Sequence, residues 1–365
     1  MGRPRRGPTF VCGVVAVSES PVSGDSRLSK TNPADHQSGR HGPSARQSLK
    51  QPLTERSDVS LREEVIDVDR EGLQPVSWRD AVWNWREWYE DSSETAAVFE
   101  NMDGDQVKGG DPNRFHPDYG DKQYAKLKDL ERGVKADYGK RLHTAMLTFT
   151  ASSMPSIHGG EPLPPVDHLD ELLSSWSAVT RELRRCMEGR RYERLAILEP
   201  HKSGYLHVHM AVFVEGKVTR ETFEPVVEAH VRNCDFAKWD AHDLDDDSTI
   251  SVRWAGGDRD EGDEDHLDEL AIYLAEYLGT YGEDPLDQPE HVQKSNAVLW
   301  ATGRQRWRPS NGAQEYMATN RSPPDPDWEL VGIEDGSGEL HEVGDGQGGV
   351  TKLETFIPGE PPPNG

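Results

Sequence analysis

The sequence predicts an α+β fold in which a central antiparallel sheet is flanked by helices. Three apolar, partly alternating segments have the pattern of β-strands, at 141–151, 191–199 and 205–216. The residues PHKSG join the last two segments as the turn of a hairpin. A long amphipathic helix is predicted at 165–189, between the first strand and the hairpin. Short strands joined in a hairpin, with helices between them, favour a sheet that packs its helices on one face.

The remaining elements extend this pattern in both directions. Helical spacing is present at 124–139 and at 219–234. A strand is expected at 248–254, and a helix is expected at 266–282 after an acidic loop. Near the carboxyl terminus, WELVGIED and KLETFIP are predicted to be two short strands.

A tryptophan-rich segment, WRDAVWNWREWYED at 78–91, is predicted to be helical. Trp78, Trp85 and Trp88 are spaced by seven and three residues, so they share one side of that helix. Such a stripe can pack into a core or stack on nucleobases, and the sequence leaves both interpretations open.

Composition divides the chain into four segments. The first is rich in Ser, Pro, Gly and Arg and has few apolar residues, which is typical of disorder. The predicted segments are a disordered basic N-terminal tail at 1–60, a helical N-terminal extension at 61–118, a main domain at 119–310 and a small or partly disordered C-terminal appendage at 311–365.

The chain carries a large excess of acidic residues. Its 365 residues have a formal net charge of −25, and its 28 arginines outnumber its 13 lysines. Low hydrophobicity and high charge can indicate disorder, but the apolar periodicity of the middle of the chain favours a folded protein adapted to multimolar salt. At about 1 M salt the Debye length is only about 3 Å, so the acidic charge does not exclude a nucleic-acid partner.

Cysteine usage and hydropathy indicate a cytoplasmic protein. Cys12, Cys186 and Cys234 have no Cys-x-x-Cys spacing, which is typical of a reducing compartment without structural disulfides. No run approaches 18 apolar residues, so no membrane span and no membrane partner are expected.

A metal site is predicted on the hairpin. His207 and His209 are two residues apart on a strand, so both imidazoles point to the same face. Glu199 ends the preceding strand, and the hairpin brings its carboxylate near them. Two imidazoles and one carboxylate can bind a divalent ion and leave positions for water and a substrate oxygen. His201 and His143 are weaker candidates for ligands.

A tyrosine stripe follows on the predicted helix 266–282. Tyr273, Tyr277 and Tyr281 are four residues apart, and Tyr281 lies nearest the apolar face of that helix. Tyr273 and Tyr277 are therefore the better candidates for presenting a hydroxyl to a site. A tyrosine becomes a nucleophile when its phenolate is stabilised locally.

These motifs together resemble those of the HUH endonucleases, and most closely the rolling-circle replication initiators of plasmids and viruses of halophilic archaea. The segments HTAMLTFTAS, EPHKSGYLHVHMAVFV and YLAEYLGTY are similar to three ordered motifs of that superfamily, over about residues 140–285. The tyrosines follow the histidine pair, as in replication initiators, whereas in relaxases the tyrosine comes first. Many initiators carry a lysine three residues after the catalytic tyrosine, where this chain has Glu276.

The resemblance implies a ferredoxin-like HUH endonuclease domain over 119–310, with the histidine pair on a middle strand. His207, His209 and Glu199 would hold Mg²⁺ or Mn²⁺, which polarises the scissile phosphate. Tyr273 would attack to give a 5′-phosphotyrosine link, and Tyr277 could act when the displaced strand is closed. The implied partners are single-stranded DNA at a replication origin, a host polymerase and, because the chain has no helicase motif, a host helicase.

Three other interpretations remain open. A transposase of the same superfamily shares the chemistry. A cupin-like barrel also uses His-x-His with a later carboxylate, here Glu215, although the predicted helices argue against an all-β fold. A non-catalytic DNA-binding protein could keep the fold without the reaction.

A basic segment near the end of the main domain is a candidate DNA contact. The residues ATGRQRWRPSNG, at 301–312, place Arg304, Arg306 and Arg308 around Trp307. Arginines on phosphates with an aromatic ring stacked on a base would suit single-stranded DNA. A solvated capping segment explains the same pattern equally well.

Overall fold

The computed structural model of the chain describes most of the predicted main domain. The described residues are 49–69, 72–109, 113–154, 161–256, 284–317, 328–335 and 338–342. The predicted tyrosine helix at 266–282 and the predicted strand KLETFIP lie outside them, as do residues 1–48 of the predicted tail.

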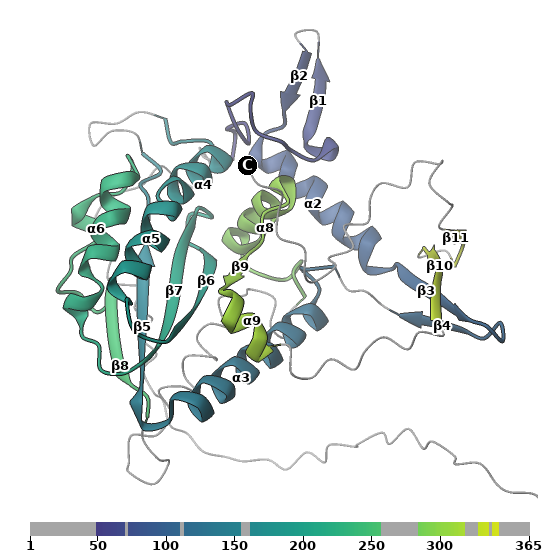
Figure 1. Cartoon of the computed structure of the whole chain (residues 1–365). Coiled ribbons are helices and arrows are strands. Elements are labelled where there is room, and N and C mark those ends of the chain that lie inside the picture. Colours follow the sequence, from purple (N-terminus) through teal and green to yellow (C-terminus); the bar gives the residue numbers. More distant parts are fainter. Residues whose placement is uncertain are drawn as a thin grey trace, which may run out of the picture. The chain divides into compact units, whose positions relative to one another are not determined.

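The main sheet has five antiparallel strands. Their spatial order is β8 (Ile250–Trp254), β5 (Leu142–Phe149), β7 (Leu206–Glu215), β6 (Tyr192–Pro200) and β9 (Trp307–Pro309). Figure 1 shows β6 and β7 side by side as the predicted hairpin. The mixed α+β class and the antiparallel sheet with flanking helices are therefore confirmed. The edge strand β9 was not predicted.

The turn of the hairpin depends on one glycine. Gly204 has a φ of 93°, which disfavours other residues. A Cβ placed there would lie 2.8 Å from side-chain carbons of Lys294, which belongs to α8 (Glu290–Thr302). The turn is thus held close to a helix that follows it by about 90 residues in the printed sequence.

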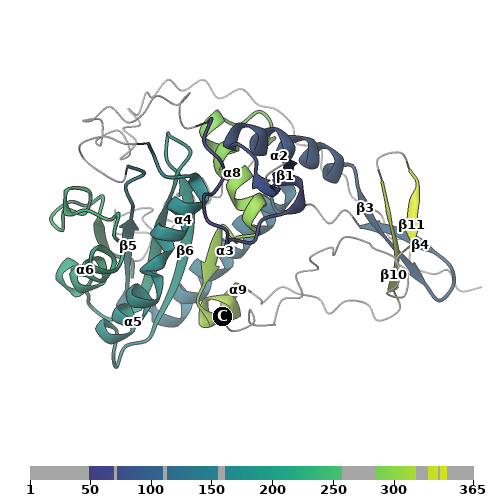
Figure 2. The same ribbon diagram turned by 90° about the horizontal axis from the view of Figure 1, so that it is seen from above.

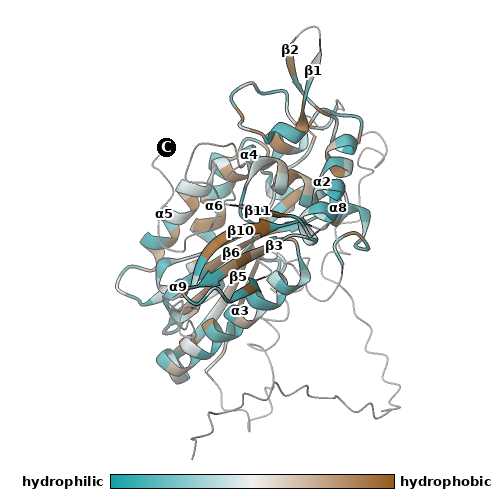
Figure 3. Cartoon of the chain, turned by 90° about the vertical axis from the view of Figure 1, so that its right-hand side faces the viewer, coloured by the Kyte–Doolittle hydropathy of each residue, from teal (hydrophilic) through white to brown (hydrophobic). Residues whose placement is uncertain are grey.

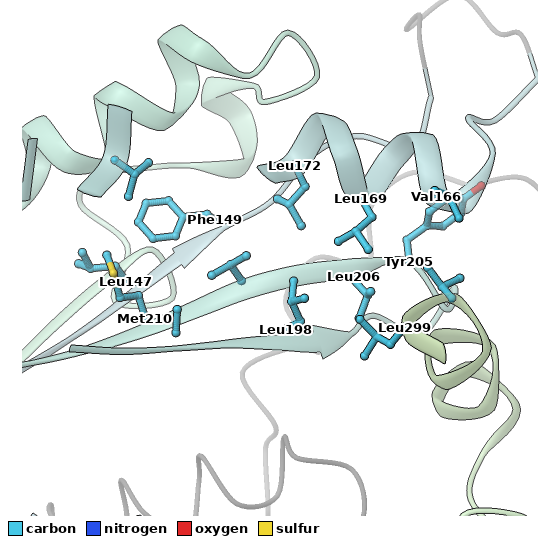
Figure 4. Packing of buried hydrophobic residues seen from close by; sticks show 14 of the residues in the cluster. Leu147, Phe149, Val166, Leu169, Leu172, Leu198, Tyr205, Leu206, Met210 and Leu299 are labelled. Carbon is cyan, nitrogen blue, oxygen red and sulfur yellow. The ribbon is translucent and has the colours of Figure 1, made fainter. Parts of the chain in front are cut away.

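One face of the sheet is covered by α4 (Pro165–Ser174), α5 (Trp176–Cys186) and α6 (Glu224–Asn233). Leu206, Val208 and Met210 point into this core, as the alternation predicts. Figure 4 shows Leu206, Met210 and Leu198 of the sheet beneath Leu169 and Leu172 of α4. We call this side the helix face.

The long helix predicted at 165–189 is two helices. It is interrupted at Ser175, whose hydroxyl pairs with His230 Nδ1 of α6 at 2.7 Å. A serine that bonds a neighbouring helix competes with the backbone bonds of its own helix. Both α4 and α5 nevertheless cover the same core.

The opposite face of the sheet is covered by α3 (Pro117–Tyr138) and α9 (Asn311–Met317), so the expectation that helices pack on one face only was wrong. The physical reason is that β6 and β7 have apolar side chains on both faces. Leu195 and Ile197 of β6, with Ala211 and Phe213 of β7, form a second buried cluster there. Strands that are apolar on both sides need cover on both sides. We call this side the metal face, since the histidines lie on it.

Residues 49–60 are ordered, which corrects the predicted disorder of that part of the tail. Leu53 is fully buried, and its backbone bonds Val76 and Val166. The Thr54 hydroxyl donates to Asp167 of α4. One buried leucine in an otherwise polar segment thus helps to hold residues 49–60 against the core.

The tryptophan-rich helix forms as α2 (Trp78–Ser93) and packs against α8. Trp78 and Trp85 are fully buried, and the Trp88 ring lies 5.7 Å from that of Trp300, so core packing explains this stripe. The predicted helical extension also holds four strands: β1 (Ile66–Asp69), β2 (Gly72–Pro75), β3 (Ala96–Asn101) and β4 (Gln106–Gly109).

A second sheet joins the predicted extension to the predicted appendage. Its order is β11 (Leu340–Glu342), β10 (Trp328–Glu334), β3 and β4, and Figure 2 shows these strands together. The strand WELVGIED is confirmed as β10, but it pairs with β3 rather than forming a separate unit. Figure 3 shows hydrophobic colour along β10 as well as β6. Short 3₁₀ helices lie at Glu63–Val65, Gly139–Arg141, Arg220–Thr222 and Trp239–Ala241.

None of the helices within the described ranges is both long enough and apolar enough to cross a membrane.

Candidate metal centre

The three predicted ligands meet at the turn end of the hairpin. Glu199 lies directly opposite His207 in the register of β6 and β7, and His209 lies opposite Ile197. Glu199 Oε2 is 2.6 Å from His207 Nε2 and 2.5 Å from His209 Nε2. The two imidazole Nε2 atoms are 3.1 Å apart. The side chains of Glu199, His207 and His209 are only 8–16% exposed.

These distances suit one bound divalent ion. Two ligands at right angles, each about 2.1 Å from an ion, lie about 3 Å apart. The separations among Glu199, His207 and His209 are close to this value, and all three donor atoms fall within 4.8 Å of one another. One carboxylate oxygen and two imidazole nitrogens are ligands that divalent metal ions accept. The three ligands leave other coordination positions for water or substrate.

A fourth residue orients one of the ligands. Thr148 of β5 lies opposite His209 in register, and its Oγ1 is 3.1 Å from His209 Nδ1. When Nδ1–H donates to this hydroxyl, the lone pair of Nε2 is directed at Glu199 and His207. A hydrogen bond behind a histidine ligand fixes its tautomer and ring orientation in this way. The role of Thr148 was not predicted from the sequence, although its place on the neighbouring strand could have suggested it.

The electrostatics of the triad favour the forms that bind a cation. Burial alone would raise the pKa of Glu199, but hydrogen bonds with His207 and His209 outweigh it and lower that pKa to about 2. Burial lowers the pKa of His207, which favours neutral imidazole. An ionised carboxylate beside neutral imidazole is the ligand set that a divalent ion requires.

The two weaker candidates do not join the triad. His201 lies in the turn, where its Nδ1 contacts Ser203, and its ring centroid is 6.4 Å from that of His207. His143 lies opposite Val214, near the other end of β5, and bonds the Arg141 carbonyl. His201 is a neighbour of the site, and His143 is remote from it.

Helix α8 brings residues close to the triad that were not predicted from the sequence. His291 is within electrostatic reach of Glu199, and burial together with His201 lowers its pKa. Lys294 is 2% exposed, and its Nζ bonds Glu290 at 2.9 Å. The sequence indicates the start of α8 only by the proline that precedes it. The approach of this helix to the hairpin turn could therefore not be predicted.

The basic segment 301–312 does not gather all three arginines around Trp307. Trp307 pairs with Ile197 on the metal face and packs in the second buried cluster. Arg308 pairs with Ala196, so it lies on the helix face. Arg304 bonds Asp170, and Arg306 bonds Asn296. Strand alternation therefore separates the tryptophan from the neighbouring arginine.

Tyr273, Tyr277 and Tyr281 lie outside the described residues, so their distance from the triad is not given by the structure. The cupin-like alternative does not fit the described part of the chain, because helices cover both faces of an open five-stranded sheet. Glu215 pairs with Leu142 at the far end of β7 and bonds Arg141.

Comparison with known proteins identifies a family. The model of the family described as "Putative rep protein (DUF1424)" matches residues 50–348. An "Uncharacterized 36 kDa protein" of Halobacterium salinarum is 42% identical over 301 residues, which are 80% of this chain and 94% of the relative. A protein of the same description from Halobacterium sp. (strain GN101) is 43% identical over 290 residues, 75% of this chain and 86% of the relative. No solved structure matches the chain. The match over residues 50–348, with two halobacterial relatives of nearly the same extent, shows that the chain belongs to this family of rep proteins.

Proposed function

We propose that the protein is a rolling-circle replication initiator of the HUH superfamily, which nicks and rejoins single-stranded DNA at a replication origin. The convergence of Glu199, His207 and His209 on one point is the observation that carries the proposal. Membership of a rep family supports replication as the process. The five-stranded antiparallel sheet, with the histidine pair on its middle strand β7, supports a ferredoxin-like HUH arrangement.

The triad would supply the electrophilic half of the reaction. His207, His209 and Glu199 would hold Mg²⁺ or Mn²⁺, which would polarise a phosphate oxygen and stabilise the charge that develops on it. A hydrogen bond from His209 Nδ1–H to Thr148 would keep His209 in the tautomer that offers Nε2 to the site. The fixed strands β6 and β7 hold these ligands in place before DNA arrives, which reduces reorganisation during the reaction.

Tyr273 would supply the nucleophile, with Tyr277 as the alternative first or second nucleophile. The phenolate oxygen forms a bond to the scissile phosphorus, and the bond from phosphorus to the 3′ oxygen breaks. The phenol proton leaves before attack, and the departing 3′ oxygen takes up a proton. The products are a 5′-phosphotyrosine and a free 3′-hydroxyl that a host polymerase can extend. Reversal of the same step rejoins DNA without ATP, because the covalent link conserves the phosphodiester.

A covalent-adduct assay tests the proposal. The purified protein, in high KCl with Mn²⁺, is mixed with labelled single-stranded origin DNA from its own replicon and resolved on a denaturing gel. We expect a protein–DNA adduct that disappears with EDTA, with His207→Ala and with Tyr273→Phe. Tyr281→Phe is the matched control, because Tyr281 is predicted to pack rather than react, and it should keep the adduct.

Two outcomes would change the proposal. An adduct that survives Tyr273→Phe but not Tyr277→Phe would move the nucleophile and keep the reaction. Absence of adduct from the folded protein with either metal would refute the nicking reaction and favour a non-catalytic DNA-binding protein. A host helicase and a cytoplasmic location belong to the same proposal.

A further inference from the structure

The helix face of the central sheet carries arginines that the proposed nicking reaction does not use. Arg194 of β6 and Arg308 of β9 lie on this face, since Arg308 pairs with Ala196 two residues from Arg194. Arg184 of α5 is close enough to affect the charge of Arg194. Glu199, by contrast, points to the metal face of the same strand.

Arginines also border a hollow on this face. Its lining includes apolar side chains of α4, α5 and β6, namely Leu173, Trp176, Ala196 and Leu198. Arg304, Arg306 and Arg308 line it as well, and it contains about 320 Å³ of space including its mouth. An apolar floor with a few charged groups at the edge is typical of ligand sites.

Trp176 lines this hollow, whereas Arg194 packs on the Trp176 ring without lining the hollow itself. The Arg194 guanidinium carbon lies 5.5 Å from the centre of the Trp176 ring, which is a cation–π arrangement. Arg194 Nη1 is buried and has no hydrogen-bond partner among the described residues. A buried donor without an acceptor is unfavourable, so Arg194 adds incompletely compensated positive charge behind Trp176.

Part of the positive charge at this place is not held in ion pairs. Among the residues that the structure describes, Arg184, Arg194 and Arg308 make no ion pair, whereas nearby Arg304 bonds Asp170. Burial lowers the pKa of Arg194, and repulsion from Arg184 and Arg308 acts in the same direction, whereas Tyr192 and Glu193 oppose it. Burial and Arg304 lower the pKa of Arg308. A chain of net charge −25 thus concentrates mutually repelling arginines at one point.

We propose that this hollow binds one unpaired nucleotide of DNA, with its base against Trp176 and the apolar floor and its phosphate on Arg308. A phosphate on Arg308 would relieve the repulsion of its guanidinium group with those of Arg194 and Arg304. An aromatic ring beside arginines is the arrangement that proteins use for single strands. Stacking also persists at multimolar salt, where charges act only over about 3 Å.

The position of the hollow suits the strand that would be nicked, and this part of the inference rests on the proposed function. β9 is an edge strand of three residues, so a DNA strand can pass around it from one face to the other. Along β6, Glu199 is three residues from Ala196, the partner of Arg308. That separation is roughly 10 Å along the strand, and a single DNA strand that passes around β9 would join the hollow to the metal centre on the opposite face.

The test measures DNA affinity without metal. Fluorescence anisotropy of a labelled oligothymidylate is recorded in EDTA and high KCl with the full chain. We expect Arg308→Gln and Trp176→Leu each to weaken binding about tenfold, while Trp176→Phe, which keeps a stacking ring, changes it less than about threefold. Arg181→Gln is the matched control, because Arg181 is an exposed arginine of the same helix that does not line the hollow.

Unchanged affinity in both Arg308→Gln and Trp176→Leu, with circular dichroism that matches the wild type, would overturn the inference. Because EDTA removes the metal, this result is independent of nicking. Loss of affinity in these variants while the wild type forms no adduct would refute the proposed function alone. If the wild type forms a normal adduct and the variants keep the wild-type affinity for DNA, only the proposed nucleotide site in the hollow is refuted.

Discussion

The two faces of the β6–β7 hairpin differ in where polar residues lie. On the helix face, Leu198, Val208 and Met210 continue an apolar core along the strands. On the metal face, the buried apolar residues of β6 end at Ile197. Its partner on β7 is His209, a member of the polar triad. Alternate residues of the same strands thus serve packing and chemistry within a few ångströms of each other. Substitutions at neighbouring positions should therefore have different consequences.

The largest effect is expected at the metal face itself. His209→Ala removes a ligand and should abolish Mn²⁺ binding measured by calorimetry, a larger loss than the roughly 10- to 100-fold caused by changes behind a ligand. His201→Ala is the matched control, since His201 contacts Ser203 and lies beside the triad. It should change affinity less than about tenfold. An equal loss in both variants would make His201 a ligand and enlarge the site.

Next in size is the loss of packing on the helix face. Met210 is fully buried, one residue after His209. Met210→Ala should lower the free energy of unfolding by about 2–5 kcal/mol, because it removes buried volume and leaves a cavity. Denaturant titration in high KCl measures this. In the folded variant, Mn²⁺ affinity should stay near the wild-type value. A parallel loss of affinity would show that the two faces are not independent.

Prediction from sequence worked where a short-range pattern settles the geometry. Alternation placed His207 and His209 on one face and Leu206, Val208 and Met210 on the other, and the hairpin brought Glu199 to them. These relations depend only on the period of a strand and on the turn. The Trp78 and Trp85 stripe likewise followed from helical spacing, although spacing alone did not choose core packing over stacking.

Prediction failed where the outcome depends on distant pairing. Leu53 was assigned to a disordered tail because its neighbours are polar, yet contacts with Val76 and Val166 fix it. The separation of Trp307 from Arg308 became visible only once β9 was known to pair with β6. The continuous apolar runs of β6 and β7 could have indicated cover on both faces, since such runs are typical of strands buried on both sides.

The buried histidines on the helix face should make the stability of the fold depend on pH. His230 pairs with the Ser175 hydroxyl and the Thr150 carbonyl, and burial lowers its pKa to about 4. The unfolded chain, with a histidine pKa of about 6.5, then binds more protons below that pH. Stability is complete above about pH 6.5 and falls toward pH 4, by about 3 kcal/mol from this residue. His168, with a pKa near 4, acts in the same direction.

Unfolding midpoints measured from neutral to acid pH test this expectation. His230→Gln should be less stable at neutral pH but should lose part of the acid dependence. His341→Gln is the control, because His341 is exposed and the pKa of its imidazole is raised by Asp335. An acid dependence that is identical in the wild type and in His230→Gln would assign the effect to other groups.

The smallest effect is expected behind the metal centre. Thr148→Val keeps the shape of the side chain but removes the hydroxyl that lies 3.1 Å from His209 Nδ1. The imidazole can then carry its proton on Nε2, which prevents ligation, so Mn²⁺ affinity should fall about 10- to 100-fold. Thr148→Ser retains the hydroxyl and should bind nearly as the wild type does. If Thr148→Val binds as tightly as Thr148→Ser, packing rather than this hydrogen bond orients His209, and the metal face is held by its apolar cluster alone.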